Sequence, residues 1–267
     1  MSEKLKIIKS FFIALSIYSK IPVPQFDWKE EDMKYSLCFF PMVGVLIGLM
    51  IYGWTWAYGS FINGNYILYI CVAVAIPLVI TGGFHVDGFM DTMDALHSYQ
   101  PREKKLEILK DPHIGAFSVI CLAIFGLIYM GAFSMIGGTY TNAYGNEAAL
   151  KIMCISFFLS RVLSALAATS FKSAKSEGML HTFSSTAEGL SVKIILIAEL
   201  VAGVVFMLFQ SLLFGGVAIA TMCIVTIFYF FKTKKEFCGI TGDTEGYFVC
   251  ILECATAVML ALMSMLF

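Results

Sequence analysis

Long apolar stretches alternate with short polar ones along the whole of this sequence. Seven of the apolar stretches have about the 20 residues that a helix needs to cross the hydrocarbon core of a bilayer. They cover residues 36–58, 65–83, 115–137, 147–170, 191–212, 213–231 and 247–267. The pattern predicts an all-α fold, a polytopic membrane bundle of about seven transmembrane helices, with residues 1–267 forming one integral membrane domain.

The first apolar run is shorter and has a different character. Lys4, Lys6 and Lys9 precede the apolar residues 11–15, and the prolines of residues 21–24 end the run without a small-residue cleavage site. A short basic and apolar segment of this kind is typical of a helix that lies in the membrane interface. We therefore expect an N-terminal interfacial helix that stays on the protein.

Composition supports a membrane protein and excludes one class of partner. The chain is 59% hydrophobic and 14% charged, with a mean hydropathy of +0.82, whereas soluble domains are about 25% charged. Its net charge of −1 gives no basic field of the kind that binds nucleic acid. We expect the lipid bilayer, and no nucleic acid, among its partners; a homo-oligomer is left open.

The basic residues are distributed unevenly between the two sides of this predicted bundle. If the N-terminus is cytoplasmic, the connections 84–114, 171–190 and 232–246 are cytoplasmic too, and all but Lys151 and Arg161 of the 18 Lys and Arg lie at or near that side. This is the bias of the positive-inside rule. It predicts a protein of the cell (inner) membrane with its polar, glycine-punctuated segments and its active site facing the cytoplasm.

Three acids directly follow the second predicted span. Asp87, Asp91 and Asp94 are spaced by four and three residues, so on a helix they share one face. Like charges at these spacings repel one another unless a cation lies between them. Oxygen-only ligands favour Mg²⁺, Mn²⁺ or Ca²⁺, and Mg²⁺ in particular combines a few carboxylates with substrate phosphates. The alternative is a set of solvated acids on an exposed helix.

A short amphipathic helix is predicted at residues 101–111, and basic groups flank it. Arg102 and Lys110 suit phosphate oxygens, although basic residues beside spans such as Arg102 also serve to orient the chain. Asp111 lies close to the membrane entry of the next span, where it is a candidate metal ligand or general base. His113, two residues further on, is a candidate phosphate contact or a structural hydrogen-bond donor.

Further polar candidates lie in the other segments of the same side. His85 projects to roughly the opposite helical face from Asp87, and Glu177 belongs to the polar connection before the fifth span. Gly242 and Asp243 form a glycine-containing turn at the start of the last span, where backbone N–H groups can contact an anion and an Asp either caps the helix or binds a metal. Arg161 and Glu253 lie within apolar spans, so each needs a polar cavity or a partner, and they can pair with each other.

Several of these segments together resemble the cobalamin synthase family, the adenosylcobinamide-GDP ribazoletransferases. The specific motif is residues 82–94, GGFHVDGFMDTMD, and the likeness continues through 106–117 (LEILKDPHIGAF) and 239–244 (GITGDT). Near the start it includes 19–24 (SKIPVP) and 40–44 (FPMVG). The resemblance spans nearly the whole chain.

This resemblance implies a Mg²⁺-dependent membrane transferase that joins adenosylcobinamide-GDP to α-ribazole or its 5'-phosphate and releases GMP. It implies a metal held by Asp87, Asp91 and Asp94, catalytic roles for Asp94, Asp111 and Lys110, and a base chosen from Asp94 or Asp111. The expected substrate-binding residues are Arg102, His113, His85, Glu177, Gly242, Asp243 and Arg161.

Two other functions are compatible with parts of this sequence. A CDP-alcohol phosphotransferase uses the same chemistry with a lipid acceptor, but its motif carries Ala-Arg where this chain has Asp91-Thr92. A divalent-cation transporter would place acids near the middle of the bilayer on discontinuous helices. This chain instead places its acids at one membrane edge, which favours the synthase.

Overall fold

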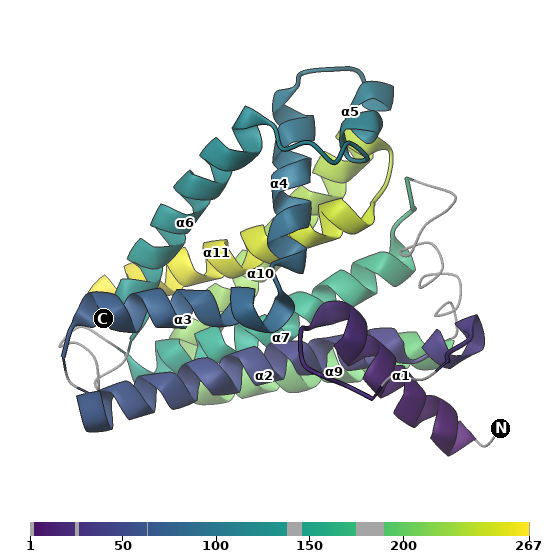
Figure 1. Cartoon of the computed structure of the whole chain (residues 1–267). Coiled ribbons are helices and arrows are strands. Elements are labelled where there is room, and N and C mark those ends of the chain that lie inside the picture. The colour runs from purple at the N-terminus through teal and green to yellow at the C-terminus, as the bar shows by residue number, and fades with distance from the viewer. Residues whose placement is uncertain (1–2, 25–26, 63, 138–145, 175–189, 267) are drawn as a thin grey trace.

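The protein is a bundle of helices, seen in Figure 1. The computed structural model describes residues 3–24, 27–62, 64–137, 146–174 and 190–266. The helices are α1 (Glu3–Tyr18), η1 (Glu30–Met33), α2 (Ser36–Ala57), η2 (Tyr58–Ile62), α3 (Tyr66–Thr81), α4 (Phe84–His97), α5 (Arg102–Ile108), α6 (Ala116–Ile136), α7 (Glu147–Ser170), α9 (Leu190–Gln210), α10 (Leu212–Phe237) and α11 (Gly242–Leu266). The predicted all-α class is confirmed.

Within the described residues, six segments are long and apolar enough to cross a membrane: α2 with η2, α6, α7, α9, α10 and α11. The pair α3 and α4 makes a seventh only if the two are counted as one broken span. On its own α3 has 16 residues, a length of about 24 Å, which is short for a hydrocarbon core of about 30 Å. The predicted span 65–83 is therefore a shorter helix than the pattern suggested, ending in a bend.

Two glycines produce the bend of 92° between α3 and α4. Gly82 and Gly83 have φ angles of +64° and +79°, a region that side chains disfavour and glycine tolerates. The backbone N–H of Gly82 closes α3 on the carbonyl of Leu78, and α4 then leaves in a new direction. The bend carries the acids of α4 away from the line of α3.

Close helix packing depends on small residues at several crossings. A Cβ built on Gly44 of α2 would lie 2.1 Å from the carbonyl oxygen of Phe157, and one on Gly48 would lie 2.4 Å from that of Cys154. Small residues of this kind let helix backbones approach closely in membrane proteins. The contact holds α2 against α7 along the centre of the bundle.

A buried ion pair links α7 to α11. Nη1 of Arg161 lies 2.6 Å from Oε1 of Glu253, and Ser160 Oγ donates to the same oxygen at 2.8 Å. The Arg161 side chain is 1% exposed. The expected pairing of these two intramembrane charges is confirmed.

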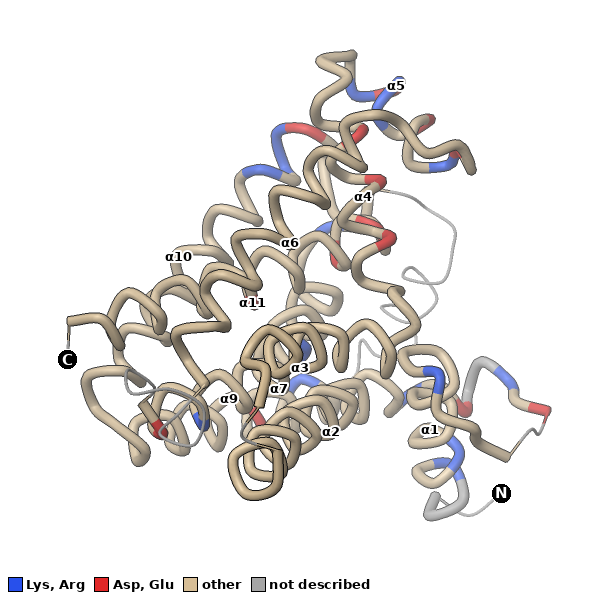
Figure 2. The backbone as a smooth tube through the Cα atoms, turned by 60° about the vertical axis from the view of Figure 1, so that its left-hand side comes forward, with Lys and Arg blue, Asp and Glu red and all other residues tan. Residues whose placement is uncertain are grey.

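The polar segments gather at one end of the bundle. Lys105 Nζ of α5 lies 2.5 Å from Glu236 Oε2 at the end of α10, and Ser173 forms an isolated parallel bridge with Ile240. Figure 2 shows most charged positions over α1, α4, α5 and the α10–α11 turn, with long uncharged stretches along α2, α3 and α6. For the described residues, the predicted grouping of these connections on one side is confirmed; which side of the membrane it faces stays a prediction.

The last two spans begin and end differently from the predicted ranges. α10 continues to Phe237, six residues beyond its predicted end, and stops at Cys238, whose φ is +56°. α11 begins at Gly242, five residues before its predicted start. The predicted boundaries were wrong because hydropathy falls at the charged ends, whereas the helical backbone continues through them.

Candidate active site

The acids of α4 lie on the side of that helix away from the core. Asp87 is exposed and Asp91 is half-buried, while His85, Phe89 and Thr92 face inward. His85 and Asp87 were predicted to lie on opposite faces of the helix. In the structure His85 is buried and Asp87 is exposed, as that prediction requires. α4 therefore offers carboxylates outward and aromatic rings inward.

The start of α11 packs against the middle of α4 beside these acids. A Cβ on Gly88 would lie 2.6 Å from the carbonyl oxygen of Asp243, and one on Gly246 would lie 2.7 Å from that of His85. Both glycines are needed for this approach. It places Asp243 next to the turn of α4 that carries Asp87 and Asp91.

Two threonines cap α11, so Asp243 is not its cap. The backbone N–H of Thr244 donates to Thr241 Oγ1 at 3.2 Å, and that of Thr241 donates to Thr244 Oγ1 at 2.8 Å. This reciprocal pair is a capping box. Asp243 accepts from the Thr241 hydroxyl at 3.4 Å in the first turn, where the helix dipole favours an acid.

Asp94 has a different environment from the other two acids of its motif. Its Oδ2 accepts from the backbone N–H of Gly115 at 2.7 Å, and its Oδ1 accepts from that of Ser118 at 2.9 Å. These are free N–H groups at the start of α6, so Asp94 caps a helix distant in sequence. Both carboxylate oxygens are engaged in holding α6 against α4.

The residues that could hold a metal are the other two acids of the motif. Within the described ranges, no group of three His, Cys, Asp or Glu side chains is placed to hold an ion. Asp87 and Asp91 lie one turn apart on one side of α4, and Mg²⁺ is commonly held by one or two carboxylates together with substrate phosphates. The donor set fits that pattern, and the three-carboxylate site stays a prediction.

Asp87 shares a cavity with a lysine from the other end of the chain. This cavity, here called the Lys20 cavity, measures about 600 Å³ between the end of α1 and the α3–α4 bend. Its polar lining includes Ser16, Ser19, Lys20, Thr81 and Asp87. A cation and a carboxylate facing one cavity suit an anionic substrate with a bound metal.

Gly82 fixes the path of the Lys20 side chain. The Lys20 backbone N–H donates to the carbonyl of Ile80 at 2.8 Å, and its side-chain carbons lie 2.3–2.9 Å from the position of a Cβ on Gly82. The lysine stem thus occupies the space that the side chain of any residue other than glycine at position 82 would need. Sequence reasoning missed Lys20 as a site residue, although the motif at residues 19–24 contains it.

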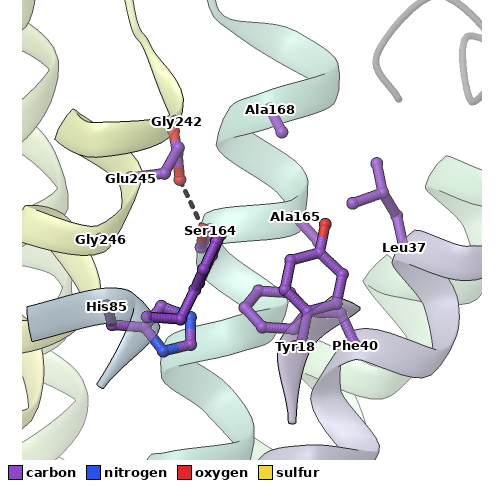
Figure 3. Close-up of a pocket in the computed structure, with 11 residues that line it drawn as sticks. Tyr18, Leu37, Phe40, His85, Ser164, Ala165, Ala168, Gly242, Glu245 and Gly246 are labelled. Atoms are coloured by element: carbon purple, nitrogen blue, oxygen red, sulfur yellow. Dashed lines mark hydrogen bonds between the residues drawn. The ribbon is translucent and has the colours of Figure 1, made fainter. Parts of the chain in front are cut away.

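A second, more enclosed space lies behind α4 and is here called the aromatic cavity (Figure 3). It measures about 70 Å³. Its walls come from α1, α2, α4, α7 and α11 and consist of Tyr18, Leu37, Phe40, Phe84, His85, Ser164, Ala165, Ala168, Gly242, Glu245 and Gly246. Phe84 also lines the Lys20 cavity, so one side chain borders both.

Of the predicted substrate-binding residues, His85 and Gly242 lie in this wall. Tyr18, Phe40 and Glu245 were missed, because aromatic residues in apolar runs carry no distinct signal and Glu245 adjoins a turn full of polar residues. Arg161 lines neither cavity, since its guanidinium is held by Glu253. Glu177 lies outside the described residues.

The remaining predicted residues lie on the connection between α4 and α6. Arg102, Lys110, Asp111 and His113 are exposed, and none of them lines the Lys20 cavity. Asp111 Oδ1 accepts from the backbone N–H of His113 at 3.0 Å and contacts its ring nitrogen Nδ1 at 2.6 Å. These hydrogen bonds, the backbone one first, hold the pKa of the Asp111 carboxyl below its usual range.

Comparison with known proteins identifies the family. The model of the cobalamin-5-phosphate synthase family matches residues 10–261. An adenosylcobinamide-GDP ribazoletransferase of Lachnoclostridium phytofermentans is 40% identical over 96% of this chain and 95% of its own length. Proteins of the same name from Clostridium botulinum strain Alaska E43 and Listeria monocytogenes are 32% and 29% identical, over 92% and 90% of this chain and 94% and 92% of their own lengths.

No solved structure matches the chain. The family match covers α2 to α10, the greater part of α1 and most of α11, and therefore both cavities and all three acids of α4. With its apolar helices, this chain belongs to the cobalamin-5-phosphate synthase family of membrane transferases.

Proposed function

We propose that this protein transfers the adenosylcobinamide-phosphate group of adenosylcobinamide-GDP to the 5'-oxygen of α-ribazole or its 5'-phosphate. A bond forms between that oxygen and the phosphorus attached to the cobinamide, the bond from this phosphorus to the guanosine phosphate breaks, and GMP leaves. The names of the curated relatives support this assignment. The observation that carries it in this chain is the Lys20 cavity, where a lysine and Asp87 face the same space.

A diphosphate is the group that this cavity suits. Its linkage carries negative charge that must be neutralised before an oxygen nucleophile can approach. Lys20 would supply one positive charge to a phosphate oxygen, and the Gly82 backbone leaves room for its stem.

We assign a magnesium ion to Asp87 and Asp91. When bound, such an ion supplies further positive charge to the bridging and leaving oxygens of the diphosphate. The chain's own part is to hold the two carboxylates one turn apart on α4, with Asp87 in the wall of the cavity. Asp94 would keep α6 in place beside them through its two backbone contacts.

Proton removal needs little from the protein in this scheme. As in phosphoryl transfer generally, positioning and charge neutralisation are expected to supply most of the rate. The lowered pKa makes Asp111 a weaker base than an ordinary carboxylate. Since Asp87 and Lys20 are exposed, the proton of the attacking hydroxyl can pass to water in the cavity.

We place the cavity on the cytoplasmic side of the cell membrane. The support is the excess of Lys and Arg in the connections at that end of the bundle. Arg102, Lys110 and His113, exposed on the connection between α4 and α6, would then meet the guanosine end of the donor as it arrives from the cytoplasm.

The decisive experiment incubates the purified protein with adenosylcobinamide-GDP, α-ribazole and Mg²⁺ and reads the products by mass. We expect GMP and the joined corrinoid only when all three are present. Asp87→Asn should lower turnover by at least about 100-fold, since even indirect partners of a metal contribute 10–100-fold. Glu103→Gln, an exposed acid of α5 at the same end of the bundle, is the matched control.

A second set of variants tests the lysine. Lys20→Met keeps the apolar stem over Gly82 and removes the charge, while Lys20→Arg keeps the charge. We expect the methionine variant to lose roughly 10–100-fold in kcat/KM for the donor, the range of a hydrogen bond to a charged group, and the arginine variant to lose less. Lys104→Met is the control, because Lys104 pairs with Glu107 on the exposed α5.

A further inference from the structure

The aromatic cavity contains a histidine whose hydrogen-bonding groups are unused. His85 is 5% exposed, and neither Nδ1 nor Nε2 has a partner in the part of the chain that the structure describes. Leaving a buried polar group unpaired costs about 1–3 kcal/mol. A neutral imidazole offers one N–H donor and one nitrogen acceptor. The ring therefore has hydrogen-bonding capacity that a polar group of a ligand could satisfy.

The other polar groups of this wall are already paired. Glu245 accepts from Ser164 Oγ at 2.5 Å on Oε2, the contact drawn in Figure 3, and from the Tyr229 hydroxyl at 2.8 Å on Oε1. The remaining lining is apolar or aromatic apart from the Tyr18 hydroxyl. A ligand of this cavity thus meets one unsatisfied ring, that of His85, in surroundings that offer little else for hydrogen bonding.

The shape of the cavity suits a flat ring. The Phe40 ring stacks on His85 with 5.6 Å between centroids and an interplanar angle of 24°, and the Phe84 ring stands edge-on to His85 at 5.4 Å and 86°. Figure 3 shows His85, Phe40 and Tyr18 reaching the same region from α4, α2 and α1. A wall that contains several aromatic side chains favours an aromatic ligand through stacked and edge contacts.

The volume sets the size of that ring. A cavity needs a volume of about 10–15 Å³ on this measure to hold one water molecule, and each molecule in liquid water occupies about 30 Å³. The 70 Å³ of this cavity therefore has room for about five waters, or roughly 150 Å³ of matter. That is the bulk of two fused aromatic rings, and it is too small for a whole nucleoside.

We propose that the aromatic cavity binds the base of the acceptor nucleoside, a fused-ring aromatic base with one free ring nitrogen that accepts a hydrogen bond from His85. This inference rests on the proposed function, since the base of α-ribazole is a benzimidazole of this kind. Phe84 borders both cavities, so a base seated behind it would direct its ribose toward the Lys20 cavity. The 5'-oxygen would then face the diphosphate.

The same surroundings disfavour the guanine of the donor. Guanine carries an exocyclic amino group, a carbonyl and several ring nitrogens, and each would need a partner on leaving water. Among the described residues, the wall offers Leu37, Ala165 and Ala168 and one unpaired imidazole, which cannot supply these partners. Sites that leave polar groups of a ligand unpaired discriminate strongly against it.

Equilibrium binding of free bases to the detergent-purified protein tests the proposal without turnover. We expect benzimidazole to bind and guanine, at the same concentration, not to bind. Phe40→Ala should weaken benzimidazole at least about tenfold, as expected when an aromatic contact and its buried area are lost. Leu49→Ala, an exposed position of the same helix α2 at 64%, should leave binding unchanged.

The role of His85 needs its own comparison, because a buried variant can alter the fold. Indene has the same fused rings as benzimidazole but no ring nitrogen. The wild type should prefer benzimidazole over indene by roughly five- to tenfold, the worth of one hydrogen bond, and His85→Leu should abolish this preference while still binding indene. A size-exclusion profile that matches that of the wild type shows that a variant is folded.

Kinetics then separate this proposal from the proposed function. In Phe40→Leu the KM for α-ribazole should rise while the KM for adenosylcobinamide-GDP stays the same. If Phe40→Leu turns over substrate with an unchanged KM for α-ribazole, the proposed base site is wrong but the transferase function is unaffected. The same conclusion follows if guanine binds to the wild type and Phe40→Ala removes that binding. Benzimidazole binding without any GMP release would instead remove the transferase.

Discussion

Gly88 of α4 and Gly246 of α11 lie against each other at the helix crossing beside the candidate metal ligands, with 3.2 Å between the Gly88 Cα and the position of a Cβ on Gly246. A Cβ on either glycine would also meet backbone, the carbonyl of Asp243 or of His85. Backbone cannot swing aside as a flexible side chain can. The aromatic cavity therefore depends on this one contact, since both α4 and α11 contribute to its wall.

We expect Gly88→Ala to separate α4 from α11. Overpacking of this kind destabilises by typically about 1–3 kcal/mol, which should lower the thermal midpoint in detergent and remove most of the activity. The control is Gly126→Ala on α6, where a Cβ meets nothing within 4 Å and alanine favours the helix by about 1 kcal/mol. Equal midpoints for the two variants would show that the crossing tolerates a methyl group.

The pair between Arg161 and Glu253 predicts a large effect on stability. Removing one partner of a buried ion pair costs about 3–5 kcal/mol because the other charge stays buried. We expect Arg161→Met to aggregate on mild heating and the double variant with Glu253→Leu to recover much of the loss. Lys151→Met is the control on the same helix, since its pair with Glu147 is 33% and 46% exposed and contributes about 0.3–0.5 kcal/mol.

If Arg161 instead contacts substrate, as the sequence suggested, the double variant would be stable and inactive. If the pair serves only the fold, the double variant would regain activity together with stability. Measuring both properties on the same preparations distinguishes these two roles.

The α3–α4 bend offers a paired test of how Lys20 is positioned. Gly82→Ala and Gly83→Ala both place a side chain at a positive φ, which costs about 1–2 kcal/mol. Only at Gly82 would the new methyl group also meet the Lys20 stem, since a Cβ on Gly83 meets nothing within 4 Å. We expect similar stability for the two variants and a higher donor KM for Gly82→Ala alone. Equal donor KM values would show that Lys20 does not depend on Gly82.

The architecture could be predicted from the sequence because apolar length alone specifies membrane helices. The helix 147–170 was predicted at the bounds the structure has. The pairing of Arg161 with Glu253 could also be anticipated, since two opposite charges in lipid have few other options. These features depend on composition and on local periodicity, both of which can be read from one chain.

The arrangement of the site could not be predicted in the same way. Lys20 and Asp87 line one cavity because α3 ends at Gly82 and the chain turns by 92° into α4, and no periodicity encodes the direction of such a turn. The spacing of Asp87, Asp91 and Asp94 correctly predicts one helix with its acids together. It cannot show that the N–H groups of α6, a helix further along the chain, approach the third acid.

Asp94 therefore gives the sharpest test of sequence pattern against geometry. If its role is to cap α6, Asp94→Ala should lose about 0.5–2 kcal/mol, as cap substitutions do. Asp94→Asn keeps one side-chain oxygen for the N–H of Gly115 or Ser118, so it should be more stable than the alanine variant and keep at least a tenth of the activity. Ser118→Ala, which retains that N–H and loses only the hydroxyl contact with Gly115, controls for disturbance of the helix start.

The contrary outcome is equally definite. A folded Asp94→Asn protein without measurable turnover, alongside an active Ser118→Ala, would restore Asp94 to the metal or to the attacking hydroxyl. In that case the contacts with α6 would have to open during the reaction. Hydrogen exchange at the amides of Gly115 and Ser118 should then become faster when substrate and Mg²⁺ are added, whereas a permanent cap keeps both amides protected.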